Sequence, residues 1–146
     1  MLKGYNDLSH SRVAGAGRVE VNSLAMLPSL ADDFTGTVAT FQSELAFTID
    51  SAATPSAATD AWTGCALELA PYAKIKVMAV SDLADGDYTL IADCILPGGV
   101  LPELVVEANA FTEPFLKNGK CRLKLAYANG ALLLHVPPRG LTVLVR

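Results

Sequence analysis

Residues able to catalyse a reaction are few in this chain, and their spacing matches no catalytic pattern. It contains two histidines, His10 and His135. His10 stands between two serines in a polar segment, where nothing would hold it as a general base. No cysteine has a histidine nearby in the sequence, and no Gly-x-Ser-x-Gly nucleophile elbow is present. The sequence therefore predicts a protein that is not an enzyme and has no catalytic residues.

Metal and cofactor sites are not predicted either. Cys65, Cys94 and Cys121 lie far apart without C-x-x-C spacing, so they indicate small buried side chains rather than a zinc site or disulfides. Aspartates cluster between Asp82 and Asp93, but they lack the ordered spacing and the closing glutamate of a calcium loop. We expect an ordinary acidic turn there, and no bound metal or cofactor.

Charge is segregated along the chain. Between Val19 and Ala73 there is no Lys or Arg but there are seven acidic residues, whereas after Glu113 there is no acid but there are six bases. Two explanations fit this pattern. Either the segments neutralise each other within one molecule, or their opposite charges align copies of the protein against one another.

The basic segment contains a candidate interaction surface. Lys120, Arg122 and Lys124 occupy alternating positions, which places them on one face of an expected strand. The net charge is −4 and no aromatic residues interleave with these bases, so a partner protein is favoured over a nucleic acid. We therefore expect these three residues to contact another protein subunit.

The elements that carry these residues are predicted to be β-strands. Apolar and polar residues alternate from Ala39 to Ile49, and again around Leu67, Ile75 and Val143, as is typical of strands with one face toward a core. A chain of 146 residues fits one ordinary domain. We expect an all-β fold, specifically an antiparallel β-sandwich or jelly roll.

Two turns are predicted from glycine-containing dipeptides. Asn129-Gly130 can supply both positive φ angles of a type I′ turn. With these residues as the loop, three cross-strand pairs follow: Tyr127 with Leu132, Leu125 with Leu134, and Lys124 with His135. The first two pairs share the apolar face and the third lies on the opposite face. Asp85-Gly86 is predicted to turn a second hairpin, between residues 75–80 and 88–95.

Two segments fall outside the strand pattern. Residues 1–17 are polar and contain glycine, and we expect them to form an extended N-terminal arm ahead of a single β domain at 18–146. Residues 50–64 form a long loop rich in Ala, Ser and Thr. Loops of this length in a folded domain are usually functional or disordered.

Candidate contact residues lie in both segments. In the arm these are Tyr5, His10 and Arg12, which we expect to reach a neighbouring subunit, with Tyr5 as the best anchor. In the loop, Trp62 either covers the core or contacts a partner. Each of these residues is a candidate for interaction rather than for catalysis.

No segment is predicted to span a membrane or to direct secretion. The most apolar region, residues 95–110, is interrupted by prolines, glycines and glutamates, well short of the ~20 uninterrupted residues that a span requires. The first residues lack the apolar stretch of a secretory signal. We expect a protein made in the cytoplasm that ends in a virion or another large assembly.

The arm at 1–17, the loop at 50–64 and the short alternating strands elsewhere resemble the small β-sandwich or jelly-roll accessory proteins of tailed-bacteriophage virions, which cement or decorate a capsid. The resemblance is one of general character, with no diagnostic motif. It implies a non-enzymatic, multi-copy, homo-oligomeric protein that bridges neighbouring subunits, which are copies of itself or a shell protein. The sequence leaves one alternative open, a carbohydrate- or peptide-binding β-sandwich module that uses the Trp62 loop.

Overall fold

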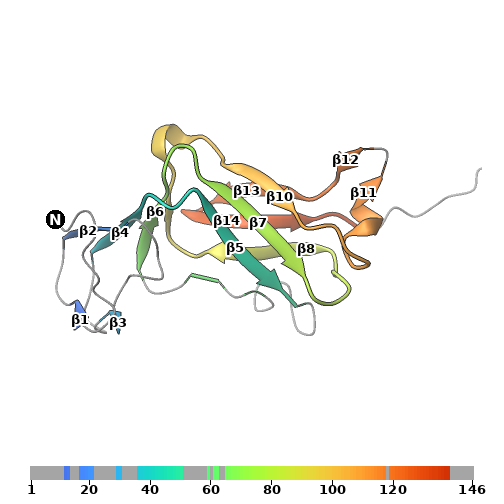
Figure 1. The fold of residues 1–146 in the computed structure, drawn as a ribbon, viewed down its shortest axis with the longest axis horizontal. Helices are drawn as coiled ribbons and strands as arrows, with labels where there is room; N and C mark the ends of the chain where they lie inside the picture. Colours follow the sequence, from blue (N-terminus) through green and yellow to red (C-terminus); the bar gives the residue numbers. More distant parts are fainter. Residues whose placement is uncertain are drawn as a thin grey trace, which may run out of the picture.

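The computed structural model describes residues 12–13, 17–21, 29–30, 36–50, 59, 61–62, 65–117 and 119–138. Within these ranges the regular structure is almost entirely β-strand (Figure 1), so the all-β prediction is confirmed. The helical elements described are two single 3₁₀ turns, η3 (Pro97–Gly99) and η4 (Glu113–Phe115). In this part of the chain, no helix is long and apolar enough to cross a membrane.

Three sheets form most of the structure. Sheet B has the strand order β2 (Arg18–Val21), β4 (Thr37–Thr40), β6 (Ala66–Glu68), β9 (Cys94–Ile95). Sheet C has the order β10 (Glu103–Val106), β7 (Lys74–Ala79), β5 (Glu44–Ile49). Sheet D has the order β13 (Lys124–Ala128), β14 (Ala131–Val136), β8 (Gly86–Ile91). Two short ladders pair β1 (Arg12–Val13) with β3 (Ser29–Leu30) and β11 (Leu116–Lys117) with β12 (Lys120–Cys121).

The sheets are not uniformly antiparallel, so that part of the prediction is wrong. Strands run parallel in sheets B and C and between β1 and β3, and antiparallel in sheet D and between β11 and β12. Side chains alternate with a period of two in both kinds of sheet, so alternation alone cannot distinguish them. Parallel neighbours need a crossover of a dozen or more residues, and residues 50–73 supply it between β5 and β7.

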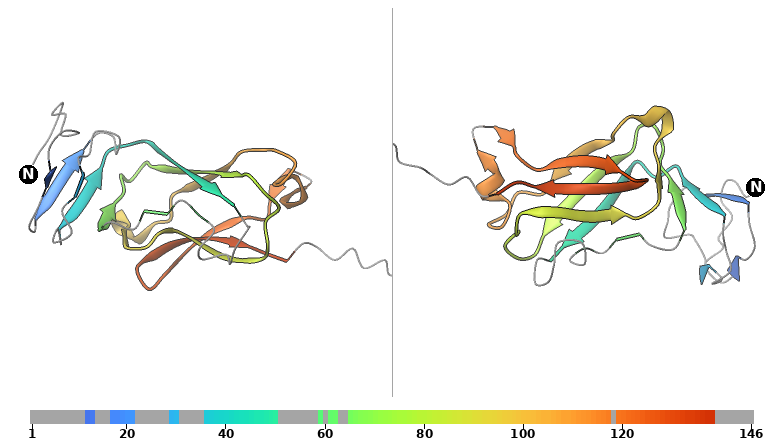
Figure 2. Two further views of the ribbon diagram at one scale, coloured as in Figure 1. Left: turned by 90° about the horizontal axis from the view of Figure 1, so that it is seen from below. Right: turned by 180° about the vertical axis from the view of Figure 1, so that it is seen from behind.

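The parallel pairs arise because the chain winds in coils. It runs from β4 through β5 to the edge of sheet D, repeats that path as β6, β7 and β8, and begins a third coil with β9 and β10 (Figures 1 and 2). Paired residues between β4 and β10 are 27 to 30 positions apart, as in Leu67 with Cys94 and Leu45 with Ile75. Each coil therefore adds one strand to sheets B and C, as coils do in β-solenoids.

The core fills the space between sheets C and D, which face each other as two layers (Figure 2), and continues into buried residues of sheet B. Because each coil repeats the alternation of the last, apolar residues stand in columns across sheet C. One column contains Leu45, Ile75 and Leu104, and the next contains Phe47, Val77 and Val106. Sheet D faces these columns with fully buried residues of β8 and β14, among them Tyr88, Leu132 and Leu134. Burying a large aliphatic side chain stabilises the fold by about 1.5–3 kcal/mol.

The hairpin predicted at Asn129-Gly130 is confirmed. These residues have φ angles of 54° and 79°, and all three predicted cross-strand pairs are present. The hairpin lies beside β8, where a third coil would otherwise add its strand. Tyr127 departs from the expected apolar face: its side chain is 45% exposed and its hydroxyl donates to the carbonyl of Cys94 at 2.6 Å.

The hairpin predicted at Asp85-Gly86 is wrong. Strands β7 and β8 belong to different sheets and do not pair. Residues 80–85 instead cross from sheet C to sheet D, and the buried side chain of Leu83 anchors this crossing in the core. A crossing of this length joins two layers, whereas a two-residue loop joins neighbouring strands of one sheet.

The predicted arm and the predicted loop are described only in part. In the arm, Arg12 and Val13 pair with residues 29–30 of the same chain. In the loop at 50–64, Thr59 bridges Ile49 of β5 and Trp62 bridges Ile91 of β8. The other residues of these two segments, apart from Gly17, Asp50 and Ala61, lie outside the described ranges.

Candidate functional site

Basic side chains gather around one shallow depression of about 380 Å³ beside sheet D. It is lined by Lys120, Cys121, Arg122, Lys124, His135 and Pro137. We call these six residues the basic depression. The structure thus brings together the three basic residues that were predicted as an interaction surface, and it adds a histidine from the neighbouring strand.

The prediction that the three bases share one strand is wrong. Strand β12 ends at Cys121 and β13 begins at Lys124, with Arg122 between them. The backbone N–H of Arg122 donates to the carbonyl of Phe115 at 2.8 Å. Because the Phe115 side chain is fully buried, this hydrogen bond holds the segment against the core. The alternating positions still direct the three side chains to one depression.

Two members of the basic depression are held by hydrogen bonds. The Arg122 Nη2 donates to the carbonyl of Pro138 at 2.9 Å. His135 lies opposite Lys124, as the hairpin register predicted, and its Nδ1 is 2.7 Å from Oδ1 of Asp87 on β8. These contacts limit the positions that the guanidinium and imidazole groups can adopt, which lowers the entropic cost of ordering them on a partner.

The positive charge of the basic depression is not neutralised within the part of the chain that the structure describes. No carboxylate there lies within 4.0 Å of the charged atoms of Lys120, Arg122 or Lys124, and the ion pair of Asp87 is with His135. Two explanations were given for the segregated charges. Neutralisation within one molecule is not supported at Lys120, Arg122 and Lys124, because no described ion pair joins them to an acid of the same chain. Two acids of the segment at 19–73, Glu20 and Glu68, pair with Arg18 instead.

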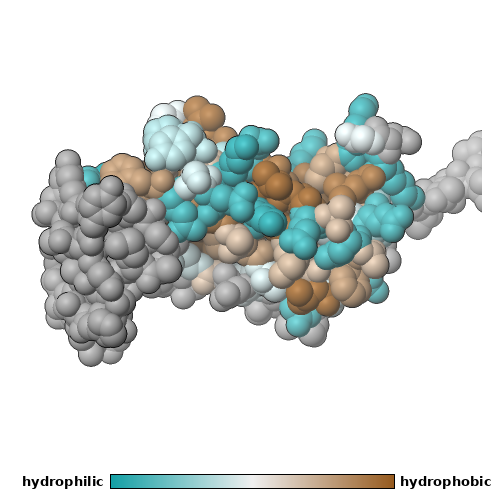
Figure 3. Space-filling view, in the orientation of Figure 1, coloured by the Kyte–Doolittle hydropathy of each residue, from teal (hydrophilic) through white to brown (hydrophobic). Residues whose placement is uncertain are grey.

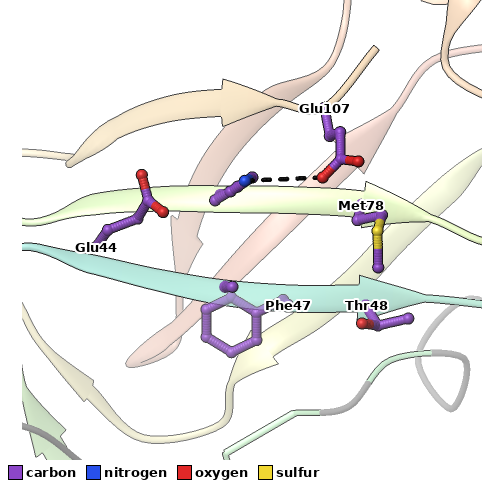
Figure 4. Close-up of a pocket in the computed structure, with 7 residues that line it drawn as sticks. Glu44, Phe47, Thr48, Met78 and Glu107 are labelled. Atoms are coloured by element: carbon purple, nitrogen blue, oxygen red, sulfur yellow. Dashed lines mark ion pairs between the residues drawn. The ribbon is translucent and has the colours of Figure 1, made fainter. Parts of the chain in front are cut away.

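A second depression, of about 230 Å³, lies on the outer face of sheet C (Figure 4). Here the lysine is paired with an acid, because Lys76 Nζ is 3.7 Å from Oε2 of Glu107. Figure 3 shows polar and apolar residues interspersed over this side of the molecule. In strand register, Lys74 of β7 stands between Glu44 of β5 and Glu103 of β10. The arrangement indicates cross-strand charge pairs that stabilise a sheet surface, rather than a ligand site.

Trp62 packs against the core as a half-buried residue. Its Nε1–H donates to the carbonyl of Cys65 at 2.8 Å, and its backbone exchanges hydrogen bonds with Leu90 and Ala92 beside β8. Of the two roles left open for this residue, its position fits the cover of the core.

The cysteines occupy three different environments. Cys94 is buried, and burial, followed by the nearby Asp93, raises its pKa to about 12. Cys65 is half-buried, and burial likewise raises its pKa. Cys121 is exposed at the basic depression, so the expectation of a buried side chain is wrong there. Within the described ranges, no three His, Cys, Asp or Glu side chains are arranged to hold a metal.

The arm residues lie largely outside the described ranges. Nothing in the structure describes Tyr5 or His10, and for Arg12 the structure gives only the backbone, in β1. The sequence also left His135 out of the interaction surface. The predicted hairpin register already placed His135 opposite Lys124, so the sequence was sufficient to add His135 to the predicted interaction surface.

The chain matches no protein-family model, and no curated protein or solved structure is significantly similar to it. A function for this chain is therefore argued from the geometry of the basic depression and the sheets around it.

Proposed function

We propose that this protein is a non-enzymatic structural component of a multi-copy assembly, and that its basic depression binds an acidic surface of a neighbouring subunit. The specific role is that of an accessory protein of a virion, which cements or decorates a capsid. The observation that carries the proposal is the cluster of three bases and one histidine around a single depression. Complementary charge of this kind aligns protein partners and speeds their association.

The depression suits a protein surface better than a small molecule. Small-molecule sites are usually concave pockets lined mainly by apolar and aromatic side chains. The basic depression is shallow, and its lining residues are charged or titratable polar side chains apart from Pro137 and Cys121. Nucleic-acid sites combine basic residues with aromatic rings on which bases stack, and no Phe, Tyr or Trp lines this one.

The scaffold supports the same role. Sheets C and D face each other across one core, as the two sheets of a β-sandwich do, although sheet C is built from parallel coils. Strand β14 pairs on both sides, with β13 and with β8. His135 and Lys124 therefore project from a paired ladder, and a docking surface on such a ladder changes little when a partner binds.

The alternative of a carbohydrate-binding module depends on the Trp62 ring. That ring packs against the core and its N–H is already bonded to Cys65. No observation therefore favours this alternative over the assembly role.

The proposal is tested with a short polyglutamate peptide as the acidic probe. The variant Lys120→Gln/Lys124→Gln removes two charges from the basic depression but keeps the Arg122 contact with Pro138. We expect it to bind the probe about tenfold more weakly than the unmodified chain, since each exposed charge pair contributes up to about 1 kcal/mol. Fluorescence anisotropy of a labelled peptide measures the affinity.

A matched control separates local from overall charge. Lys74→Gln/Lys76→Gln changes the net charge by the same amount, but these lysines lie on sheet C beside Glu103 and Glu107. We expect this control to bind as the unmodified chain does. Equal losses in both variants, or no loss in the first, would contradict a role for the basic depression.

A further inference from the structure

Strand β10 ends sheet C with an apolar edge. It pairs with β7 on one side, and no other strand that the structure describes pairs with its second side. Leu104, Val105 and Val106 are all only half-buried. Edge strands are ordinarily protected by charged residues or prolines because their unpaired backbone groups attract other chains. Here Pro102 and Glu103 stand at the start of the edge and Glu107 at its end, which leaves the three apolar residues 104–106 between them.

The backbone of β10 shows which groups face this open edge. The N–H of Glu107 donates to the carbonyl of Val77 at 2.9 Å, so residue 107 directs its backbone groups toward β7. Direction alternates along a strand in a parallel pair, so residue 105 does the same. The N–H and C=O groups of Leu104 and Val106 therefore face outward.

The acidic residues that flank this edge are already engaged. Glu103 lies 3.7 Å from Nζ of Lys74, and Glu107 lies 3.7 Å from Nζ of Lys76, both on β7. Their charges are thus partly offset within the chain. These two acids disfavour partner strands that bring another acid opposite them, but they leave the outward backbone groups of β10 accessible.

We propose that β10 pairs with β10 of a second copy of this chain, antiparallel, about a two-fold axis perpendicular to sheet C. Leu104 then stands opposite Leu104 of the second copy, and the two residues exchange their outward N–H···O=C hydrogen bonds. This contact continues sheet C into the second copy and places the two apolar faces on the same side. The surface is self-complementary, as a two-fold contact requires.

Charge selects this register over its alternatives. If the axis passed through Val105 instead, Glu103 would stand opposite Glu107 of the second copy, and like charges directly opposite are destabilising. If β10 instead paired with β5 of the next copy in the parallel register of sheet C, Glu103 would meet Glu44. In the Leu104-centred register, Glu103 faces Val105 and Glu107 faces Leu101. Val106 faces Pro102, whose carbonyl can accept a hydrogen bond although proline has no N–H to donate.

Exposed apolar residues lie beside this edge. Val100 is 72% exposed and Leu101 is 43% exposed, in the turn that leads from η3 into β10. A second copy on the edge would cover part of both side chains and add apolar area to the backbone contact. Exposed apolar residues that adjoin an unpaired edge are typical of protein interaction sites.

The contact goes beyond the proposed function and uses a different surface. It rests on backbone hydrogen bonds and apolar side chains, which salt does not screen, whereas the basic depression depends on charge. Loss of one contact therefore leaves the other measurable.

Two opposite substitutions at one position test the contact. In the Leu104-centred register, Val105→Lys places a cation opposite Glu103 of the second copy, and Val105→Glu places an anion there. We expect Val105→Lys to tighten the dimer about three- to tenfold and Val105→Glu to weaken it by a similar factor. Sedimentation equilibrium of the full chain gives the dissociation constants, and thermal unfolding confirms that each variant folds.

The outcomes that would overturn the proposal are distinct. A single-chain mass for the unmodified protein at all concentrations would contradict the dimer. If both variants shifted the dissociation constant in the same direction, the register would be contradicted. With an axis through Val105, the substituted residue would stand opposite the same residue of the second copy, and either charge would repel its counterpart. Unchanged dissociation constants would place any dimer contact elsewhere.

Discussion

Arg18 holds together two strands of sheet B that are not neighbours. Its guanidinium donates from Nε to Glu20 of β2 at 3.1 Å, and from Nη1 to Glu68 of β6 at 2.9 Å, across the intervening strand β4. The hydrogen bond to Glu68, and then that to Glu20, raise the pKa of Arg18 above its ordinary value. The same hydrogen bond lowers the pKa of Glu68.

Replacing this guanidinium tests its contribution to stability. We expect Arg18→Gln to lower the free energy of unfolding at neutral pH by about 1–2 kcal/mol, since the pair is two-pronged but largely exposed. Arg18→Lys should lose less, because it keeps the charge without the planar fork. Urea denaturation measures all three proteins.

The pH dependence of this loss follows from the lowered pKa of Glu68. A carboxyl with a lowered folded-state pKa stabilises the fold above its unfolded pKa, and this contribution disappears as the pH falls through the folded value. The stability difference between the unmodified chain and Arg18→Gln should therefore shrink in acid. A difference that stayed constant down to strongly acidic pH would contradict the assigned ion pair.

At the scale of elements, the pairing of strands joined by a short turn could be predicted from the sequence, whereas the pairing of strands far apart in the chain could not. The Asn129-Gly130 turn specifies its own hairpin, because a two-residue loop fixes both strands and their register. The parallel pairs between β4 and β6 and between β7 and β10 join residues 29 positions apart, and no local turn specifies them. The Asp85-Gly86 dipeptide is also typical of a hairpin turn, but here it ends the segment that crosses from sheet C to sheet D.

One signal in the sequence could have indicated the coils. The alternating segments that begin at Glu44, Lys74 and Glu103 start 30 and 29 residues apart, and each places apolar residues at the second position and two residues later. Recurrence at a fixed period of 20 to 50 residues is typical of coiled and repeated architectures. The residues themselves differ between the three segments, so the repeat is visible in the alternation of apolar and polar positions and not in sequence identity.

The confirmed hairpin gives a prediction at this scale. Gly130 has a φ of 79°, and a Cβ placed there would meet no atom within 4 Å. Gly130→Ala should therefore destabilise the protein through backbone conformation alone, by about 1 kcal/mol. Thermal unfolding measures this against Gly119→Ala, which has a φ of 69° and equally open surroundings in the β11–β12 turn. A loss several times larger at Gly130 would contradict a purely conformational cost.

At the scale of the whole molecule, the candidate site was predictable in its residues but not in its shape. Alternation brought Lys120, Arg122 and Lys124 to one side. The depression itself also needs the break between β12 and β13, the bond from Arg122 to Phe115, and the path of Pro137. These depend on tertiary contacts that no window of the sequence contains.

Net charge and local charge give opposite expectations for an acidic partner. The chain carries a net charge of −4, which disfavours approach of another anion. The basic depression presents three bases without a carboxylate partner among the described residues. At short range the local charges dominate, because exposed charges beyond about 10 Å are screened at ordinary salt concentrations.

The most direct measurement is therefore the affinity of the unmodified full chain for polyglutamate at low and at high salt. The account predicts that the peptide binds despite the negative net charge, and that binding weakens strongly as salt is raised. Absence of binding at low salt, or an affinity that does not change with salt, would contradict the basic depression as a docking site for acidic protein surfaces.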